Sequence, residues 1–289
     1  MIAFDDIESK LLTSDFKAKL FVVTDDMRNE KEYQGAENKF GITVNDVDYL
    51  VKLRKNNWLN CYSEHIGSRF IRACGGFAQK TILSLYKDKV VVICEDFTNI
   101  YGNLKTFSNL SSSSFDTDPR RYDYYFEDII HELKKLYRLD MDSELINFWM
   151  MYLFDIILGN PDRHGGNWGV YLKNDKYKFS PIFDNGATLF PRITKFTVDS
   201  DWMRERIYTF PNPKIMFKEL SRSGYYEVIK NGICPKCVID TFKSFDVILS
   251  IDKATNGFTE EARKFYRTVV FYRYSCLIKG EDFVWKGMI

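Results

Sequence analysis

Three oxygen-bearing side chains, Asp162, Asn167 and Asp184, lie close enough in the sequence to share one metal site. Asp162 and Asn167 are five residues apart, and the Gly-Gly pair between them permits a tight loop that brings both side chains to one face. Phosphoryl transfer from Mg-ATP requires one carboxylate to orient or deprotonate the attacking hydroxyl, and hard oxygen ligands to hold magnesium. We expect Asp162 to act on the hydroxyl, and Asn167 and Asp184 to bind magnesium.

The same residues have a simpler interpretation, because Asp and Asn are common in turns for backbone reasons alone. An isolated Asp-x-x-x-x-Asn would favour that interpretation. Here Arg163 and His164 follow the first aspartate, and a Phe-Asp-x-Gly sequence ends at Gly186, so the metal site is favoured. His164 could deprotonate a hydroxyl, since histidine titrates near neutral pH, or it could hydrogen-bond to the loop and hold it rigid. The second role is favoured.

Helical periodicity precedes this loop. Apolar residues recur every three to four positions over residues 126–137 and again over 145–158. Asp142 or Ser143 is the expected N-cap of the second helix, and Gly159 is its expected stop. The metal-site loop is therefore predicted to follow a helix C-terminus directly.

A hairpin is expected after the loop, with strands over residues 168–172 and 177–183 that turn at Asn174-Asp175. The second strand would place Asp184 at its end, beside the loop that carries the other two candidate ligands. From Trp202 onwards the pattern is mostly helical and is punctuated by prolines.

The first third of the chain is predicted to combine a sheet with one helix. The expected elements are a hairpin over residues 39–53 that turns at Asn45-Asp46, a helix over 60–74 that stops at Gly75, and strands over 80–86 and 89–94. This order indicates a layered α+β lobe. A serine-rich tract over residues 108–114 is read as a loop rather than a regulatory phosphorylation site, and the boundary between two lobes is placed near residues 97–99.

Composition gives no sign of a nucleic-acid-binding, membrane-spanning or secreted protein. The 41 basic and 40 acidic side chains nearly cancel, so net charge indicates neither a nucleic-acid nor an anionic-membrane partner. No apolar run approaches the roughly 18–20 residues that span a bilayer, and the acidic N-terminus lacks a secretory signal pattern. We expect the protein to be cytoplasmic when it is synthesised. Export by a route that needs no N-terminal signal stays open. Cys234 and Cys237 have zinc-knuckle spacing, but no second pair accompanies them, which disfavours structural zinc.

The Asp-Arg-His-x-x-Asn sequence followed by Phe-Asp-x-Gly resembles the HipA-like and phosphatidylinositol-kinase-like branch of the protein-kinase fold. The similarity runs from about residue 35 to residue 192 and includes segments in the same order at 51–53, 61–65, 90–98, 158–164 and 181–184. It implies a bilobal α+β fold, with a β-rich N-lobe over residues 1–97 and a mostly helical C-lobe over 98–289.

The resemblance also implies roles for residues outside the metal-site loop. Lys52 matches the strand lysine that neutralises the α- and β-phosphates of ATP, and Glu64 matches the helix glutamate that pairs with it. Glu95 to Phe97 match the hinge, whose backbone groups read the adenine edge. The loop that covers the phosphates departs from the usual Gly-x-Gly-x-x-Gly, because only Gly35 and Gly41 are present, so the segment from Gly35 is a weak candidate.

From these observations we expect a Mg-ATP-dependent kinase that phosphorylates serine or threonine residues of proteins, itself included. One alternative keeps the site but changes the acceptor to a phosphoinositide or another small alcohol. Another is a nucleotide-binding regulator with negligible turnover. The sequence leaves the acceptor and the oligomeric state open.

Overall fold

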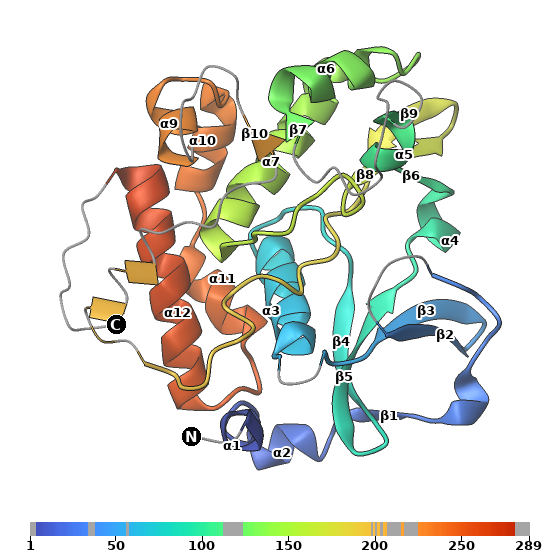
Figure 1. The fold of residues 1–289 in the computed structure, drawn as a ribbon, viewed down its shortest axis with the longest axis vertical. Helices are drawn as coiled ribbons and strands as arrows, with labels where there is room; N and C mark the ends of the chain where they lie inside the picture. The colour runs from blue at the N-terminus through green and yellow to red at the C-terminus, as the bar shows by residue number, and fades with distance from the viewer. Residues whose placement is uncertain are drawn as a thin grey trace.

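The computed structural model describes residues 4–33, 38–55, 58–111, 124–197, 199, 201–202, 205–206, 215–216 and 225–280. The chain has a β-rich part and a mainly helical part, with helix α3 lying between the sheet and the C-terminal helices (Figure 1). Gly35 and residues 112–114 of the serine-rich tract lie outside the described residues.

A five-stranded sheet forms the β-rich part, in the order β1-β4-β5-β3-β2. β1 pairs parallel with β4, and the other neighbours are antiparallel. Both two-residue turns, Asn45-Asp46 and Lys87-Asp88, have positive φ at each position, which matches the right-handed twist of a hairpin. The predicted hairpin over residues 39–53 is therefore confirmed, and the two strands predicted over 80–86 and 89–94 pair with each other as a second hairpin. The strands are β1 (Phe21–Val23), β2 (Lys39–Val44), β3 (Val47–Lys52), β4 (Thr81–Tyr86) and β5 (Lys89–Glu95).

Helix α3 (Asn60–Ala73) packs against β4 and β5 on one side and against α11 (Val247–Ala254) on another. Nearly every residue of α3 is buried, as a helix covered on both sides requires. Cys74 caps its C-terminus, and Gly75 follows with φ of 83°. The helix predicted over residues 60–74, with its glycine stop, is confirmed.

The helical part is centred on α7 (Met141–Leu158), which ends at Gly159 in the left-handed conformation. The predicted N-cap was wrong: the helix begins earlier, and the Asp140 carboxylate accepts a hydrogen bond from the Ser143 amide. The structure also differs from the loop predicted from residue 108 onwards, because Ser108 to Ser111 belong to the short helix α5 (Phe107–Ser111). The other helices are α4 (Thr98–Tyr101), α6 (Phe126–Lys134), α9 (Tyr225–Lys230), α10 (Lys236–Lys243), α12 (Glu260–Tyr274) and η2 (Ser275–Lys279).

A small sheet follows α7 in the chain and carries the segment that leads to Asp184. It has the order β6-β8-β9, with β6 at Leu104–Thr106, β8 at Gly169–Lys173 and β9 at Lys176–Phe179. The Asn174-Asp175 turn is confirmed, but β9 ends at Phe179 and does not reach residue 183. Ile182 then forms an isolated parallel bridge with Ala78 of the α3–β4 connection. A second pair of short strands, β7 (Tyr124–Tyr125) and β10 (Ile215–Met216), is parallel.

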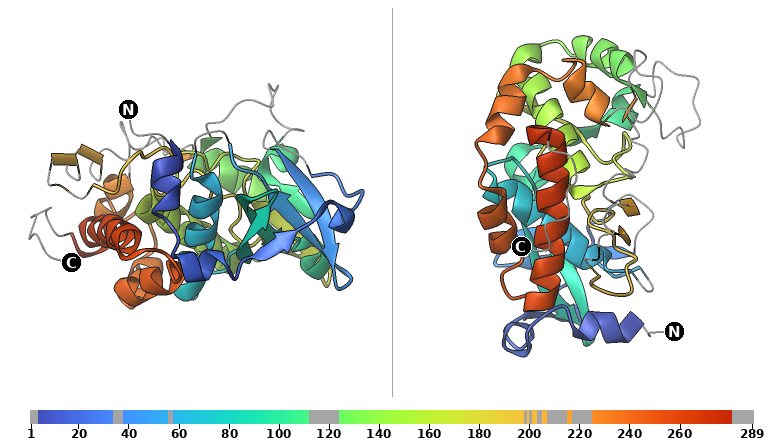
Figure 2. Two further views of the ribbon diagram at one scale, coloured as in Figure 1. Left: turned by 90° about the horizontal axis from the view of Figure 1, so that it is seen from below. Right: turned by 90° about the vertical axis from the view of Figure 1, so that its left-hand side faces the viewer.

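The N-terminal segment crosses the base of the molecule, from the C-terminal helices to the edge of the large sheet (Figures 1 and 2). It contains α1 (Phe4–Ser9), α2 (Ser14–Lys17) and η1 (Asp25–Met27). Leu12 forms an antiparallel bridge with Phe258, and the Thr13 amide donates to the Gly257 carbonyl at 3.0 Å.

One hydrophobic core joins the two parts. Phe154 of α7 packs edge-on against Phe70 of α3, with ring centroids 6.2 Å apart, and against Phe242 of α10 at 4.8 Å. A smaller cluster on the other face of the large sheet includes Val51 and Ile93. Among the described residues, no helix combines the length and the apolar character needed to cross a bilayer.

Candidate active site

Three residues predicted to share a site meet at the end of β3. The Lys52 ammonium lies 2.9 Å from Glu64 Oε2 and 2.7 Å from Asp184 Oδ1. The lysine comes from the sheet, the glutamate from α3, and the aspartate from the segment after β9. The side chains of Lys52 and Glu64 are 8% and 1% exposed, whereas that of Asp184 is 32% exposed. The ion pair is therefore sheltered from solvent on the lysine side and open on the aspartate side.

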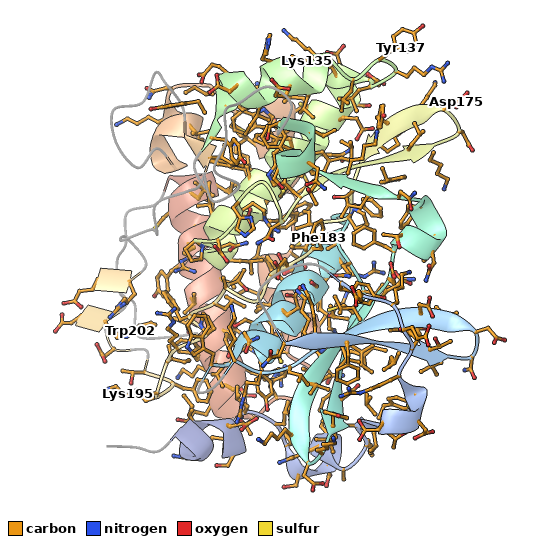
Figure 3. The ribbon with its side chains drawn as sticks, turned by 45° about the vertical axis from the view of Figure 1, so that its right-hand side comes forward. Lys135, Tyr137, Asp175, Phe183, Lys195 and Trp202 are labelled. Atoms are coloured by element: carbon orange, nitrogen blue, oxygen red, sulfur yellow. The ribbon has the colours of Figure 1, made fainter. Side chains whose placement is uncertain are left out.

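Asp184 adopts a backbone conformation that is uncommon for a residue with a side chain, with φ of 61°. Burial opposes ionisation of its carboxyl group, but the ammonium of Lys52, together with the more distant cations Arg163 and Lys39, lowers its pKa to about 2. Asp184 is thus a carboxylate at neutral pH. The preceding residue, Phe183, is seen near the middle of the molecule in Figure 3, and its ring lies 5.5 Å from that of Phe97, the N-cap of α4.

Asp162 and Asn167 lie on one loop, as their spacing predicts. The Asn167 amide donates through Nδ2 to the Asp162 carbonyl at 2.9 Å, which leaves its Oδ1 as the oxygen able to bind a cation. The Asp162 amide donates to Oδ1 of Asn160 at 3.0 Å. Within the described part of the chain the exposed Asp162 carboxylate accepts no hydrogen bond, so it is available to a substrate hydroxyl.

Arg163 holds this loop in place, a role that the sequence did not reveal. Its buried guanidinium donates to both carboxylate oxygens of Asp155 at 2.9 Å, to the Asn167 carbonyl at 2.8 Å, to Oδ1 of Asn185 at 2.7 Å and to the Phe183 carbonyl. Burial alone would lower the pKa of Arg163, but the negative charge of Asp155 raises it. One side chain thus connects the end of α7, the loop and the segment that carries Asp184.

Asn185 connects the same segment to α3. Its backbone amide donates to Glu64 Oε1 at 3.0 Å, and its Nδ2 donates to Ser68 Oγ at 2.9 Å. Glu64 is therefore held on one oxygen by Lys52 and on the other by Asn185. The only sequence signal for this network was Asp155, which is the single charged residue in an apolar run over residues 148–158.

His164 contacts its own loop. Its Nδ1 accepts a hydrogen bond from the Gly166 amide at 3.0 Å, and its backbone amide donates to the Asp162 carbonyl at 2.8 Å. Because Nδ1 is used as an acceptor, the proton of the neutral ring is on Nε2. These contacts are those of a residue that braces the loop.

The hinge segment uses some of its backbone groups within the protein. The Glu95 amide donates to the Lys80 carbonyl at 2.9 Å, and the Glu95 carbonyl accepts from Gln79 Nε2 at 2.8 Å. The Phe97 amide, by contrast, donates to no acceptor among the residues that the structure describes. Of the two predicted adenine-reading residues, Phe97 therefore offers an available donor, and the Glu95 carbonyl is already shared.

Asp96 fixes the segment before Gly35 to the hinge. Its side chain is 2% exposed, lies 2.5 Å from the Lys31 ammonium and accepts from the Tyr33 hydroxyl at 2.8 Å. Burial works against ionisation, but Lys31, Thr98 and Tyr33 together lower the pKa of Asp96. The chain that enters the candidate phosphate loop is thus tied to the β5 end of the site.

The donor set suits magnesium. Magnesium prefers oxygen ligands and keeps several waters or phosphate oxygens, so two protein ligands such as Asp184 and Asn167 suffice. The described residues contain no group of three or more His, Cys, Asp or Glu side chains arranged for a metal ion. The two cysteines with zinc-knuckle spacing lie at the start of α10, where Cys234 is buried and Cys237 is exposed.

Comparisons with known proteins agree with this arrangement. Serine/threonine-protein kinase CtkA of Helicobacter pylori is 28% identical over 270 residues, which cover 86% of this chain and 83% of that protein. The crystal structure of the H. pylori proinflammatory kinase CtkA matches with a TM-score of 0.76 and 26% identity over 90% of this chain and 95% of that one. HipA of Shewanella oneidensis, solved with HipB and operator DNA, matches with a TM-score of 0.59 over 96% of this chain and 71% of that one.

The two structural matches confirm the bilobal, kinase-like α+β fold that the sequence resemblance implied. At 13% identity the HipA match bears on the fold alone. Residues 32–223, well over half of the chain, match the model of the HipA-like C-terminal domain. The chain therefore belongs to the HipA-like C-terminal domain family.

Proposed function

We propose that this protein is a Mg-ATP-dependent kinase that phosphorylates serine or threonine hydroxyls of proteins, itself included. The observation that carries the proposal is the Lys52 ammonium, held by the buried Glu64 carboxylate and facing Asp184. A lysine restrained in this way is a fixed positive charge for the phosphates of a nucleotide. The name of the similar H. pylori protein, a serine/threonine-protein kinase, supports a hydroxyl of a protein as the acceptor.

The other site residues complete this proposal. Asp184 and Oδ1 of Asn167 would hold magnesium, which when bound offsets the negative charge of the phosphates. The exposed Asp162 would orient and deprotonate the acceptor hydroxyl. The Phe97 amide would donate to the adenine ring. Arg163 and His164 act on the loop and are positioning residues.

The test is phosphoryl transfer from γ-labelled ATP with magnesium, offered to mixed proteins and, separately, to phosphoinositide vesicles. Asp162→Asn and Asp184→Asn should each lower transfer by about 10²-fold or more, since they remove a proton acceptor and a metal ligand. Asp175→Asn is the matched control, because this aspartate is 82% exposed at the tip of the β8–β9 hairpin.

Three other outcomes would argue against a protein kinase. Undiminished transfer by Asp162→Asn or Asp184→Asn would contradict the proposal. Labelling of vesicles but not of proteins would favour a lipid kinase. A nucleotide-dependent rise in Tm without any labelled product would favour a nucleotide-binding regulator.

A further inference from the structure

A surface pocket of about 330 Å³ lies between α3 and α11, away from the candidate active site. It is lined by Arg69 of α3, by Asp252 and Lys253 of α11, and by Asn256 of the turn that follows. Arg69 is five residues beyond Glu64 on α3, which places it about 140° further around the helix axis. The pocket and the Lys52 site therefore use different sides of the same helix.

Two cations that line the pocket form no ion pair with the carboxylate that also lines it. In the described part of the chain neither Arg69 nor Lys253 forms an ion pair, and the polar atom that contacts the Arg69 guanidinium is His65 Nε2 at 3.5 Å. The partly buried position of Arg69 disfavours its charged form and lowers its pKa, although guanidinium remains protonated. A counterion of opposite charge would offset this cost.

The neighbouring groups do not supply that counterion. Asp252 is already paired with other arginines, because its Oδ1 accepts from Arg267 Nε at 2.9 Å and Nη2 at 2.7 Å and lies 3.7 Å from Arg263. His65 is 3% exposed, and burial, together with the nearby charge of Arg69, lowers its pKa to about 3. It is therefore neutral, and the local charge of the pocket is positive.

We propose that this pocket binds a small phosphate-bearing anion, with Arg69 and Lys253 as charged ligands and the Asn256 amide as an additional donor. The planar guanidinium suits two phosphate oxygens at once, and the volume lies at the lower end of the roughly 300–1,000 Å³ of small-molecule sites. The bound anion would link α3 to α11. Because α3 carries Glu64, and Ser68 contacts Asn185, occupancy would hold the Lys52 site in the arrangement seen here.

Calorimetric titration with inorganic pyrophosphate tests the site independently of catalysis. The wild type should show a binding event that the Arg69→Gln/Lys253→Gln double variant loses, or binds about tenfold or more weakly, since hydrogen bonds to charged groups are removed. Both proteins keep the active site, so the difference between their isotherms reports the pocket alone. Lys230→Gln/Lys236→Gln is the matched control: it removes two exposed lysines from α9 and α10 and should bind as the wild type does.

Hydrogen exchange provides the second measurement. Pyrophosphate should slow amide exchange in α3 (Asn60–Ala73) of the wild type and of the control pair, but not of the pocket variant. Equal isotherms for the wild type and the pocket variant would overturn the proposal. So would equal weakening by both double variants, because that result would reflect net charge and not this pocket.

Discussion

At the scale of single residues, the candidate catalytic and metal-binding side chains could be predicted from the sequence, but the side chains that position them could not. Asp162, Asn167 and Asp184 were predicted because their types and spacing suggest a metal and phosphate site, whereas Lys52 was assigned only through the family resemblance. Arg163 was missed as a structural centre, since its partners come from three separate segments and no local pattern brings them together. Only the folded chain shows which residues share one guanidinium.

Removing the Arg163 side chain should be among the most damaging single changes. Arg163→Met leaves Asp155 as a buried charge without its partner, and we expect the free energy of unfolding to fall by about 3–5 kcal/mol. Arg163→Lys keeps the charge but cannot donate to all the same acceptors, so its cost should be intermediate. Urea unfolding measures both. Arg138→Met, which breaks an ion pair with side chains 49% and 82% exposed, should cost less than about 1 kcal/mol.

The depressed pKa of Asp184 predicts how stability depends on pH. Its carboxylate is stabilised by Lys52 in the folded state, so this stabilisation is present above the unfolded pKa near 3.8 and is lost as pH falls towards about 2. Asp184→Asn removes it, and asparagine tolerates the positive φ. The variant should be about 1–2 kcal/mol less stable at pH 7, a value reduced for partial exposure. Urea titrations should show this difference shrinking below about pH 4, and a difference that stays constant down to pH 2.5 would contradict the assignment.

At the scale of helices and strands, prediction succeeded where a local signal determines the geometry. The turns at Asn45-Asp46 and Asn174-Asp175 have residues that accept positive φ, and both hairpins form as expected. Prediction failed at the N-terminus of α7, where neighbouring polar residues can each act as an N-cap. Asp142 and Ser143 were the predicted caps, but the Asp140 carboxylate is the one that accepts from the Ser143 amide. The end of β9 could not be predicted, because Ile182 pairs with Ala78, a contact between distant segments.

The C-terminus of α7 provides a test of how an element positions the site. Gly159 has φ of 67°, and a Cβ there would overlap the buried guanidinium of Arg273. Gly232 has nearly the same φ, 68°, with no atom within 4 Å of such a Cβ. Gly232→Ala should therefore cost only the left-handed strain of about 1–2 kcal/mol, and Gly159→Ala should cost clearly more.

Unfolding in guanidinium chloride measures both alanine variants. Because Gly159 precedes the Asp162 loop, Gly159→Ala should also reduce phosphoryl transfer under conditions in which the protein stays folded. Equal destabilisation by the two substitutions would show that Arg273 moves aside, and that the packing beneath the loop is not fixed.

At the scale of the whole molecule, two segments outside the family match support each other. The match begins at residue 32 and ends at residue 223, yet Leu11 and Thr13 hydrogen-bond through their backbone to Thr259 and Gly257. The same N-terminal segment reaches the β-rich part, where Glu8 pairs with Arg54 and accepts from the Tyr62 hydroxyl at 3.0 Å. A contact between residues nearly 250 positions apart has no local sequence signal, and so the sequence did not predict it.

This arrangement predicts that the N-terminal segment stabilises the whole chain and not only itself. Leu11 is fully buried, and Leu11→Ala should lower the free energy of unfolding by about 2–5 kcal/mol through lost burial and the cavity that remains. Of the five tryptophans, the buried Trp149 and Trp168 lie in the helical part, far from residue 11 in the sequence, so tryptophan fluorescence includes the unfolding of that part. Its unfolding midpoint should move with that of the overall circular dichroism, in one transition. Val22→Ala, at a position 54% exposed, is the control and should move neither. An early loss of helix signal in Leu11→Ala with an unchanged tryptophan midpoint would instead mean that the segment detaches alone, and that the kinase-like body is stable without it.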